Sequence, residues 1–463
     1  MNRVSLRPPI VTTAPPPVSA PRPASVRIPI LALVLFLAMP ESPGWAQAIE
    51  AGTAERESVR NEPRPEYDPI GVNARQLWYA VGETLGQPRR PQSMYLMPKL
   101  ASFEIRPKLE LETVYDDNIF RENANESDDI IFIANPEIEI ESDWVNHSVA
   151  LKLSSEYARH RDFNSEDYFD YRAAFENRLD IGLFTTLRSS VFVERETESR
   201  SSLDSLRASP SPARQLNYGF ESTLEYDSDV GLLRTRLSGR RADWRDTGDI
   251  DNDTRDEDTL ELVQRVGYTV SPGTTLFIEP AVGTDQFVLG TDRSGLDKDS
   301  KSYRARAGVT WDASGVTFVE VGVGWERELF ESPSLKDIGG LSYEGRVLWN
   351  PTDLMTLDLQ FGREIGETTA STQSGRVIDM VELSVDYAPL HNVIFDGLVG
   401  FEHDEFRGIG RVDKNFAGAL GVKYLINRFF FARLNYEFDE RESDSPTSNF
   451  TNNRITLSLG SQL

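Results

Sequence analysis

The last residues of the chain, 453–463, alternate apolar and small polar side chains up to the final position. Such alternation places apolar side chains on one face of a β-strand and polar ones on the other, as in a strand that crosses a membrane. In lipid, each unpaired backbone group at a strand edge costs several kcal/mol, so a terminal strand has to pair with another strand. The pattern therefore predicts a closed β-barrel.

The same period of two recurs from Ser102 onward, and the alternating segments are joined in turn by a short connection and by a long, mostly acidic one. Outer-membrane barrels have short periplasmic turns and longer outer loops, so this order predicts roughly 18 antiparallel strands with both termini in the periplasm. The short connections are expected at 141–143, 182, 227–231, 271–274, 312–315, 350–353, 388–392 and 426–428. The long ones are expected at 116–129, 159–167, 195–215, 245–257, 285–299, 326–339, 363–374, 403–410 and 439–448.

Single strands show the two faces clearly. Tyr303, Ala305 and Ala307 alternate with Arg304 and Arg306. A soluble β-sandwich would also alternate, but one of this length would divide into domains, and no linker sequence is visible after residue 102. We therefore predict an all-β fold, a transmembrane antiparallel up-and-down β-barrel over residues 101–463.

Aromatic residues recur beside the connections, which predicts the two aromatic belts of a membrane barrel. Aromatic residues favour strands in any protein, but their position next to turns favours the belts. The periplasmic belt is expected to contain Tyr226, Tyr268, Trp311, Trp349, Tyr387 and Tyr424. The outer belt is expected to contain Tyr115, Tyr157, Trp244, Trp325, Phe401 and Tyr436.

The composition is acidic, with 49 basic and 74 acidic side chains and a net charge of -25 among 463 residues. The mean hydropathy of -0.41 would by itself indicate a soluble protein. A barrel strand, however, needs only one apolar residue in two, so periodicity decides the class. The negative charge argues against a nucleic acid partner, and the lack of cysteine removes disulfides and thiolate metal sites.

The N-terminal part has a different pattern. An apolar run at 28–39 follows Arg22 and Arg27 and precedes the small-residue site 46–48. It is shorter than the roughly 20 residues of a membrane-spanning helix, so we predict a signal peptide over 1–48, cleaved after Ala48, with a retained anchor as the alternative. Residues 49–100 are polar and contain several prolines. They predict a periplasmic lead-in that is partly disordered, or a small plug in the barrel.

If the apolar positions face lipid, their alternates line the lumen, and many of these are charged. The acidic residues come from strands near both ends of the barrel sequence, and the basic ones from the strands between. Two interpretations are open: opposed basic and acidic walls that create a transverse field, or ion pairs that brace the wall. The predicted basic residues are Arg172, Arg178, Arg188, Arg234, Arg236, Arg240, Arg265, Arg304, Arg306 and Arg346. The predicted acidic residues are Glu104, Glu110, Glu137, Glu139, Asp358, Glu382 and Asp386.

Catalysis is not expected, because no serine or aspartate stands at a recognisable spacing from any of the four histidines, His147, His160, His391 and His403. No cofactor is expected either. The acidic segment 249–253 begins like a calcium loop but lacks the glycine and the later glutamate of an EF-hand, so no metal site is predicted. Loose divalent bridging to lipopolysaccharide phosphates and a simply solvated run of charges both remain open.

Two segments at opposite ends of the predicted barrel carry a family resemblance. They are Val114-Tyr115-Asp116-Asp117-Asn118-Ile119-Phe120 and the stretch 450–457. Together they resemble the outer-membrane β-barrel porin type 2 family over residues 100–463, with Tyr115, Asp116, Asp117 and Asn118 as the more specific motif. The resemblance implies a diffusion or export pore, and many members resemble proteins associated with exopolysaccharide secretion. Leu463 departs from the terminal Phe common in such strands.

The leading functional prediction is a channel in the outer membrane of a Gram-negative bacterium. It would pass polar or charged solutes, or export an exopolysaccharide, because an arginine-rich wall suits an anionic polymer. The alternative is a plugged barrel with a structural or adhesive role. The expected partners are outer-membrane lipid and lipopolysaccharide, the outer-membrane insertion machinery, and an anionic polysaccharide or periplasmic export components.

Overall fold

The structure is a computed structural model that describes residues 99–462 except 101, 204, 206–208, 249, 292–295, 314, 367 and 369–373. Almost all of its regular elements are strands, with three short 3₁₀ helices in the connections. The strands are β1 (Lys99–Leu100), β2 (Phe103–Asp116), β3 (Asp129–Ser142), β4 (Ser148–His160), β5 (Tyr168–Asp180), β6 (Thr185–Thr197), β7 (Arg214–Asp227), β8 (Gly231–Arg245), β9 (Glu257–Ser271), β10 (Thr274–Phe287), β11 (Ser300–Asp312), β12 (Thr317–Phe330), β13 (Ile338–Thr352), β14 (Met355–Gly366), β15 (Gly375–Leu390), β16 (Val393–Arg407), β17 (Val412–Leu425), β18 (Phe430–Ser443) and β19 (Phe450–Gln462). The 3₁₀ helices are η2 (Asn164–Glu166), η3 (Asp253–Arg255) and η4 (Pro446–Ser448).

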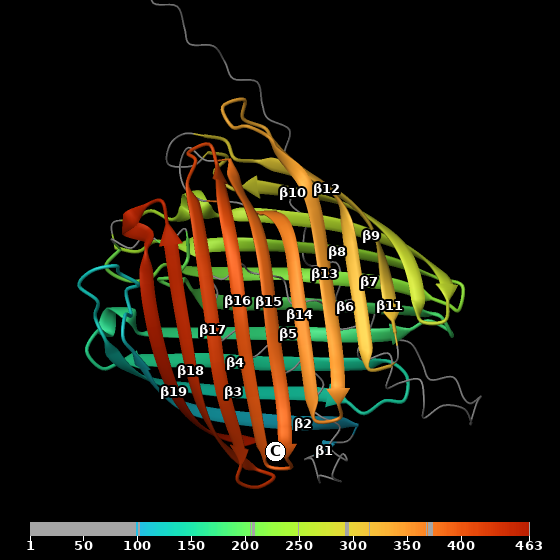
Figure 1. The fold of residues 1–463 in the computed structure, drawn as a ribbon, viewed down its shortest axis with the longest axis horizontal. Helices are drawn as coiled ribbons and strands as arrows, with labels where there is room; N and C mark the ends of the chain where they lie inside the picture. Colours follow the sequence, from blue (N-terminus) through green and yellow to red (C-terminus); the bar gives the residue numbers. More distant parts are fainter. Residues whose placement is uncertain are drawn as a thin grey trace, which may run out of the picture. The chain divides into compact units, whose positions relative to one another are not determined.

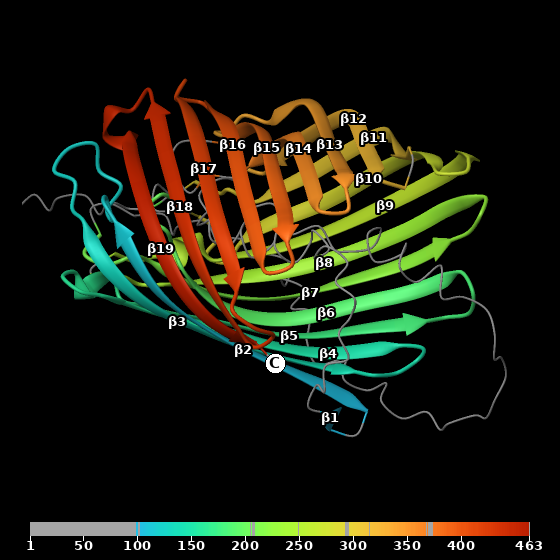
Figure 2. The ribbon, with the colours of Figure 1, turned by 60° about the horizontal axis from the view of Figure 1, so that its bottom comes forward.

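The strands β2 to β19 form a closed antiparallel ring of 18 strands (Figures 1 and 2). Each strand pairs with its neighbours in sequence, and β19 pairs with β2 in a register that joins Ile455 to Tyr115. The two-residue strand β1 only extends the edge of β2. The predicted fold class, the strand number and the pairing of the terminal strand are confirmed. In the part of the chain that the structure describes, no helix is long and apolar enough to cross a membrane.

Short and long connections alternate around the ring as the sequence predicted, except that 408–411, predicted to be long, is as short as the turns at the other end. Glycines with positive φ stand in three of the short turns, Gly182 at 79°, Gly273 at 79° and Gly315 at 71°, a backbone conformation that favours glycine. Most long connections are shorter than expected, because strands such as β12, β16 and β18 continue further, to Phe330, Arg407 and Ser443. Below, the two ends of the barrel are called the short-turn end and the long-loop end. Which end faces the periplasm stays a prediction.

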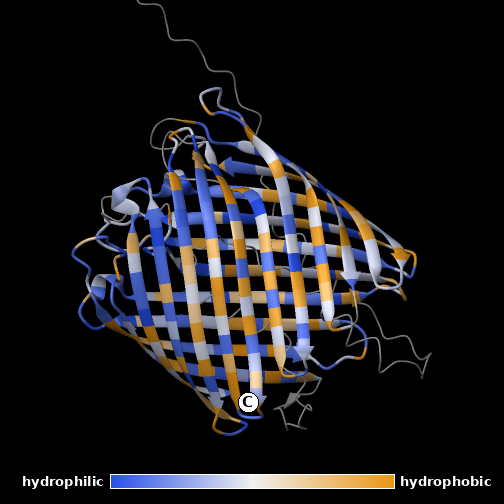
Figure 3. Ribbon diagram, viewed as in Figure 1, coloured by the Kyte–Doolittle hydropathy of each residue, from blue (hydrophilic) through white to orange (hydrophobic). Residues whose placement is uncertain are grey.

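The barrel has its apolar face outside and its polar face inside. On β2, Leu109 and Leu111 are exposed, whereas Glu110 and Glu112, which alternate with them, are buried. Figure 3 shows the resulting alternation of apolar and polar residues along most strands. Apolar packing inside is limited to small groups, such as Val114, Ile131, Ile133 and Ala158 beneath Tyr168. Strand pairing and the hydrophobic outer face therefore take the place of a central apolar core.

The domain predictions before the barrel fall almost wholly outside the described residues. The predicted signal peptide, 1–48, lies entirely outside them. Of the predicted lead-in, 49–100, only β1 is described, with Lys99 opposite Glu104 of β2. Both domain assignments stay predictions.

Candidate functional site

The charged residues predicted to line the lumen all lie on the inner face of their strands. On β8, Arg234 and Arg236 alternate with Leu233 and Leu237, which are exposed on the outer face. Residues that lie opposite each other on paired strands share a face of the sheet. Arg234 lies opposite both Glu225 and Arg265, so these two residues also face inward. The same register places Arg172, Arg178, Arg188, Arg240, Arg304, Arg306, Arg346, Glu104, Glu110, Glu137, Glu139, Asp358, Glu382 and Asp386 on the inner face.

Each predicted lumen arginine forms an ion pair with a carboxylate of the same face. The pairs are Arg172 with Glu194, Arg178 with Asp180, Arg188 and Arg234 with Glu225, Arg236 and Arg304 with Glu261, Arg240 with Glu257, Arg265 with Glu279 and Glu320, Arg306 with Glu344, and Arg346 with Asp358. Two opposed walls of single charge would leave these guanidinium groups without carboxylates beside them. The geometry therefore favours ion pairs that brace the wall.

Arg265 on β9 is the centre of the densest group. Its guanidinium contacts Glu279 of β10, Glu320 of β12 at 3.0 Å and Glu344 of β13 at 3.8 Å, and it stacks 4.1 Å from the ring of Phe277. Arg265 is only 4% exposed. A buried cation held by carboxylates from three strands fixes the relative position of those strands, because losing any partner leaves a charge unpaired.

The acidic residues are distributed unevenly around the lumen. Between β2 and β3, Arg106 forms an ion pair with Glu139, and Lys108 forms one with Glu137. By contrast, Glu110, Glu382 and Asp386 make no hydrogen bond or ion pair with any described residue. Arg376 is the only cationic inner-face residue described on β14 to β16. The carboxylates of that arc are Asp358, Glu364, Glu382, Asp386, Asp396, Glu402 and Asp404. This part of the lumen is therefore net negative.

The long connection 198–213, between β6 and β7, reaches across the mouth of the barrel at the long-loop end. It is held to two neighbouring loops and to the inner face of β18, which is separated from β6 by β5, β4, β3, β2 and β19. The contacts are Arg255 Nη2 with Glu198 at 2.7 Å, Arg200 Nη2 with Glu166 at 2.8 Å, and Arg441 Nη2 with the carbonyl oxygen of Ser201 at 2.7 Å. A loop fixed at these points narrows the entrance. Sequence reasoning found the loop but not this position, because alternation carries no information about where a loop folds.

The family-like motif lies at the seam where the barrel closes. Asp116 accepts hydrogen bonds from Asn452 Nδ2 at 2.6 Å and from Arg121 Nη1 at 3.1 Å, and pairs with Arg454 at 3.3 Å. Asp117 accepts the backbone N–H of Asn453 at 2.7 Å.

Asn118 continues the same contact toward the last strand. It donates from Nδ2 to the carbonyl oxygens of Glu122, at 2.8 Å, and of Thr451, at 2.9 Å. The two segments that carry the resemblance, more than 300 residues apart, thus contact each other directly. Tyr115 points outward and is exposed.

A model of the family described as "Putative beta-barrel porin 2" matches residues 99–463. The chain belongs to this family. The match spans the whole described barrel and includes both halves of the seam. The protein is a porin-like barrel of the Gram-negative outer membrane.

Three solved structures show similarity to this porin 2 family barrel. OccK2 (OpdF) of Pseudomonas aeruginosa, in complex with glucuronate, is 13% identical, with a TM-score of 0.43 and coverage of 78% of this chain and 98% of its own. A BenF-like porin from Pseudomonas fluorescens Pf-5 is 12% identical, with a TM-score of 0.43 and coverage of 78% and 99%. The siderophore receptor PirA from Acinetobacter baumannii is 8% identical, with a TM-score of 0.43 and coverage of 79% and 81%. No curated protein matches the sequence.

Most of the aromatic residues predicted for the two belts lie on the outer face of the porin 2 family barrel. All six residues predicted for the periplasmic belt are exposed there, next to the short turns. At the long-loop end, Tyr115, Tyr157, Trp325, Phe401 and Tyr436 are also exposed outward. Trp244 was predicted for this belt, and that prediction is wrong. It lies on the inner face of β8, opposite Gln215, and its ring stacks 3.5 Å from the guanidinium of Arg255.

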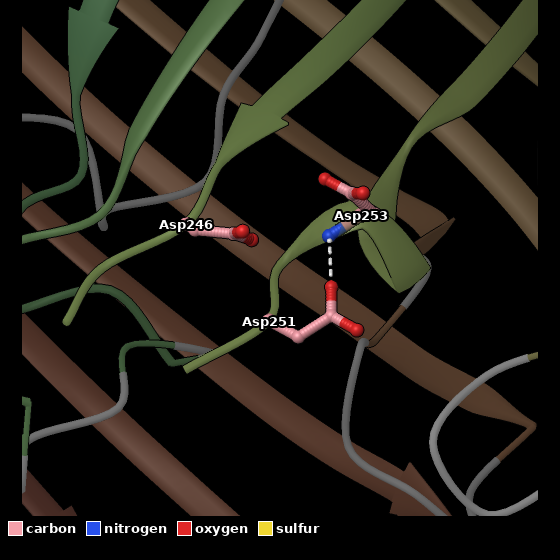
Figure 4. Close-up of side chains that lie close together, drawn as sticks. All are labelled: Asp246, Asp251 and Asp253. Atoms are coloured by element: carbon pink, nitrogen blue, oxygen red, sulfur yellow. Dashed lines mark hydrogen bonds between the residues drawn. The ribbon is translucent and has the colours of Figure 1, made fainter. Parts of the chain in front are cut away.

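Two groups of carboxylates in the long loops have oxygens within 4.8 Å of one another: Asp246, Asp251 and Asp253, and Asp297, Asp299 and Glu331. Figure 4 shows the first group, in which Asp251 accepts the backbone N–H of Asp253 at 3.0 Å. Asp246 accepts the backbone N–H of Asn252, also at 3.0 Å. These hydrogen bonds account for the turn of the loop. Burial raises the pKa of the adjacent Asp256, which accepts a hydrogen bond from the backbone N–H of Trp244.

Proposed function

We propose that this barrel is a passive channel for polar or charged solutes. The observation that carries the proposal is the inner wall, which is lined on nearly every strand by ionised side chains held in cross-strand pairs. Ionised groups require water or partners, and a ring of 16 to 18 strands is wide enough for an aqueous path. The 198–213 loop narrows this path at one end without contacting every strand of the mouth.

The proposal includes an orientation. Both termini lie in the periplasm, and the long loops face the cell exterior, where lipopolysaccharide surrounds them. The exposed apolar belt contacts the membrane lipid. The insertion machinery of the outer membrane recognises the terminal strand. The signal peptide over 1–48 directs export and is removed during it. Alternating short turns and long loops support this orientation, since outer-membrane barrels place their long loops outside.

Single-channel conductance in planar bilayers tests the channel. The full chain without residues 1–48 and a second form that begins at residue 99 are refolded, and heat-modifiable gel migration shows that each is folded. A steady conductance in both forms supports an open channel. A conductance only in the shorter form indicates a barrel plugged by residues 49–98. Silence in two folded forms overturns the proposal and favours the structural or adhesive barrel.

Export of an anionic exopolysaccharide is the second candidate. It is favoured by the arginines gathered on β8 and β11, because a guanidinium has five N–H groups and one ion pair uses only some of them. Weak and repeated contacts of this kind let a polymer slide. Added polyuronate should then block the channel from the periplasmic side in a length-dependent manner. Block by monomeric uronate alone would support the general channel instead.

A further inference from the structure

A cavity of about 410 Å³ lies at the long-loop end, on the outer side of the barrel, over β5 to β8. It is lined by Tyr171, Arg195, Arg214, Leu216, Arg245 and Asp246, with residues of the two loops above. Tyr171, Arg195 and Leu216 form one cross-strand row, and Arg214 lies opposite Arg245. These five strand residues occupy the outward-facing positions of their strands, and only Gln215 of β7, which also lines the cavity, stands at an inward-facing position. The cavity therefore faces the membrane side and not the lumen.

The guanidinium groups of this cavity differ from those of the lumen in having few carboxylate partners. Arg195 makes no hydrogen bond or ion pair with any described residue. Arg214 donates from Nη2 to the carbonyl oxygen of Asp167 at 3.2 Å, while its Nε is buried with no partner among the described residues. Arg245 has only the carboxylate of Asp243, at 3.5 Å, and stays largely exposed.

This arrangement favours the binding of an anion. Two like charges directly opposite each other on neighbouring strands, such as Arg214 and Arg245, destabilise a sheet. An anion with several oxygens between them would reverse that effect, because charge-assisted hydrogen bonds to guanidinium are strong and directional. The one acidic lining residue, Asp246, already accepts the N–H of Asn252 and is held to its own loop.

The position of the cavity narrows the choice of anion. One step further from the long-loop end, the outer face carries Val193 and Tyr218, followed by Val191 and Phe220, and then the apolar belt continues. A ligand in the cavity therefore meets guanidinium groups at its head and hydrocarbon beneath. An amphiphile with a phosphorylated head group fits both parts, as a free anion does not.

We propose that this cavity binds a phosphate of an outer-leaflet glycolipid, the lipid A portion of lipopolysaccharide, with Arg195, Arg214 and Arg245 as donors. The inference rests on the orientation given under Proposed function. The acyl chains of the bound glycolipid run along the outer face beside Val193 and Phe220. The site lies on one arc of the barrel only, so it holds a particular glycolipid molecule rather than the lipid annulus as a whole.

Lipid A binding to the full chain without residues 1–48 tests the proposal. The protein is refolded from inclusion bodies, so that it carries no lipopolysaccharide, and binding in detergent is followed by native mass spectrometry. The triple variant Arg195→Gln, Arg214→Gln, Arg245→Gln should bind lipid A roughly tenfold more weakly or worse, the loss expected from removing charge-assisted hydrogen bonds. Arg327→Gln is the matched control, since Arg327 is also an outward arginine at the long-loop end but is paired with Asp337 at 3.0 Å. It should leave binding unchanged.

Three further arms separate the alternatives. Dephosphorylated lipid A should bind the native protein as weakly as phosphorylated lipid A binds the triple variant. Displacement of lipid A by millimolar inorganic phosphate alone would indicate a site for the free anion and would overturn the proposal that the ligand is a glycolipid. Equal binding of phosphatidylglycerol would place the site with inner-leaflet lipid and overturn the orientation. Equal lipid A binding by native and triple-variant proteins would overturn the site itself.

Conductance distinguishes this inference from the channel proposal. The triple variant alters the outer surface only, so its conductance should equal that of the native protein while its lipid A binding falls. A silent native channel that still binds lipid A through these arginines would overturn the channel and support the site.

Discussion

A single arginine shows how strongly the lumen charges depend on one another. Arg265 is buried among Glu279, Glu320 and Glu344, so Arg265→Leu removes the cation that these three carboxylates share. We expect a loss of about 3–5 kcal/mol in the free energy of unfolding, the usual result of removing one partner of a buried ion pair. Urea unfolding of the barrel in lipid vesicles measures it.

Arg327→Leu is the control for this prediction. Arg327 pairs with Asp337 on the outer surface, and both side chains are largely exposed. Its removal should cost less than about 1 kcal/mol. Equal losses for the two variants would contradict the structural role given to the Arg265 group.

Asn177 presents the opposite case, a polar side chain on the lipid face. It lies between the exposed residues Phe175 and Leu179 on β5 and makes no hydrogen bond with any described residue. Asn177→Leu should stabilise the barrel in lipid by roughly 1 kcal/mol, because an unsatisfied amide is replaced by an apolar group. The unfolding midpoint in urea should rise.

Asn217 provides the matched comparison. It is 1% exposed, faces inward on β7 and donates to Glu196 at 3.2 Å. Asn217→Leu should lower the unfolding midpoint. A rise for Asn217→Leu, or a fall for Asn177→Leu, would mean that the two faces are assigned incorrectly.

At the residue scale, alternation predicted the face of a side chain but not its partners. Counting by two from Arg240 places Trp244 on the inner face, and the error arose because nearness to a loop was used in place of that count. The partners of Arg265 could not be predicted, because Glu320 lies two strands beyond Glu279 and the contact depends on the curvature of the sheet. The free charges of Arg195 and Arg214 were missed for the same reason.

At the scale of elements, the seam between β2 and β19 is expected to depend on the family motif. Asp116→Ala would leave Arg121 and Arg454 buried without their shared carboxylate. We expect a loss of about 3–5 kcal/mol, seen as a lower temperature at which the folded gel band disappears. Asp312→Ala, at an exposed short turn where Asp312 accepts the Gly315 N–H, is the control and should change that temperature little. Equal falls in this temperature for the two variants would show that Asp116 at the seam stabilises the barrel no more than a residue of an exposed turn.

The 198–213 loop should set the size and steadiness of the entrance. Arg441→Ala removes the hydrogen bond to Ser201 and frees the loop from β18. Single-channel recordings should then show a larger mean conductance and more flicker between levels.

Arg433→Ala tests whether any inner arginine of β18 would have this effect. Arg433 pairs with Asp396 toward the short-turn end, so its loss should leave the flicker unchanged. The loop assignment would be contradicted by identical recordings from native and Arg441→Ala channels.

Elements were the most predictable level of this structure. Turn sequences and the switch between short and long connections located the strands, because a membrane imposes both the strand length and the period of two. The seam was only partly predictable. The sequence marked 114–120 and 450–457 as the family-like segments, and barrel closure implied that the first and last strands meet, but the hydrogen bonds between Asp117 and Asn453 required the register.

At the scale of the whole molecule, the lumen charge predicts ion selectivity. Carboxylates outnumber cationic groups on the described inner face, most clearly on β14 to β16, where Glu382 and Asp386 have no described partner. Negative charge along a water-filled path concentrates cations and excludes anions. The open channel should therefore prefer potassium to chloride, with a reversal potential of the cation-selective sign in a potassium chloride gradient.

Charge substitutions determine whether that preference arises from the inner wall. The variant Glu382→Gln, Asp386→Asn should lower the cation-to-anion permeability ratio several-fold. Arg304→Gln, which removes a positive charge from beside Glu261 and Glu326, should raise this ratio. High salt should weaken both changes through screening. An anion preference in the native channel would contradict the predicted selectivity and would favour the exopolysaccharide conduit. It would mean that the arginines on β8, β9 and β11, rather than the carboxylates on β14 to β16, govern permeation.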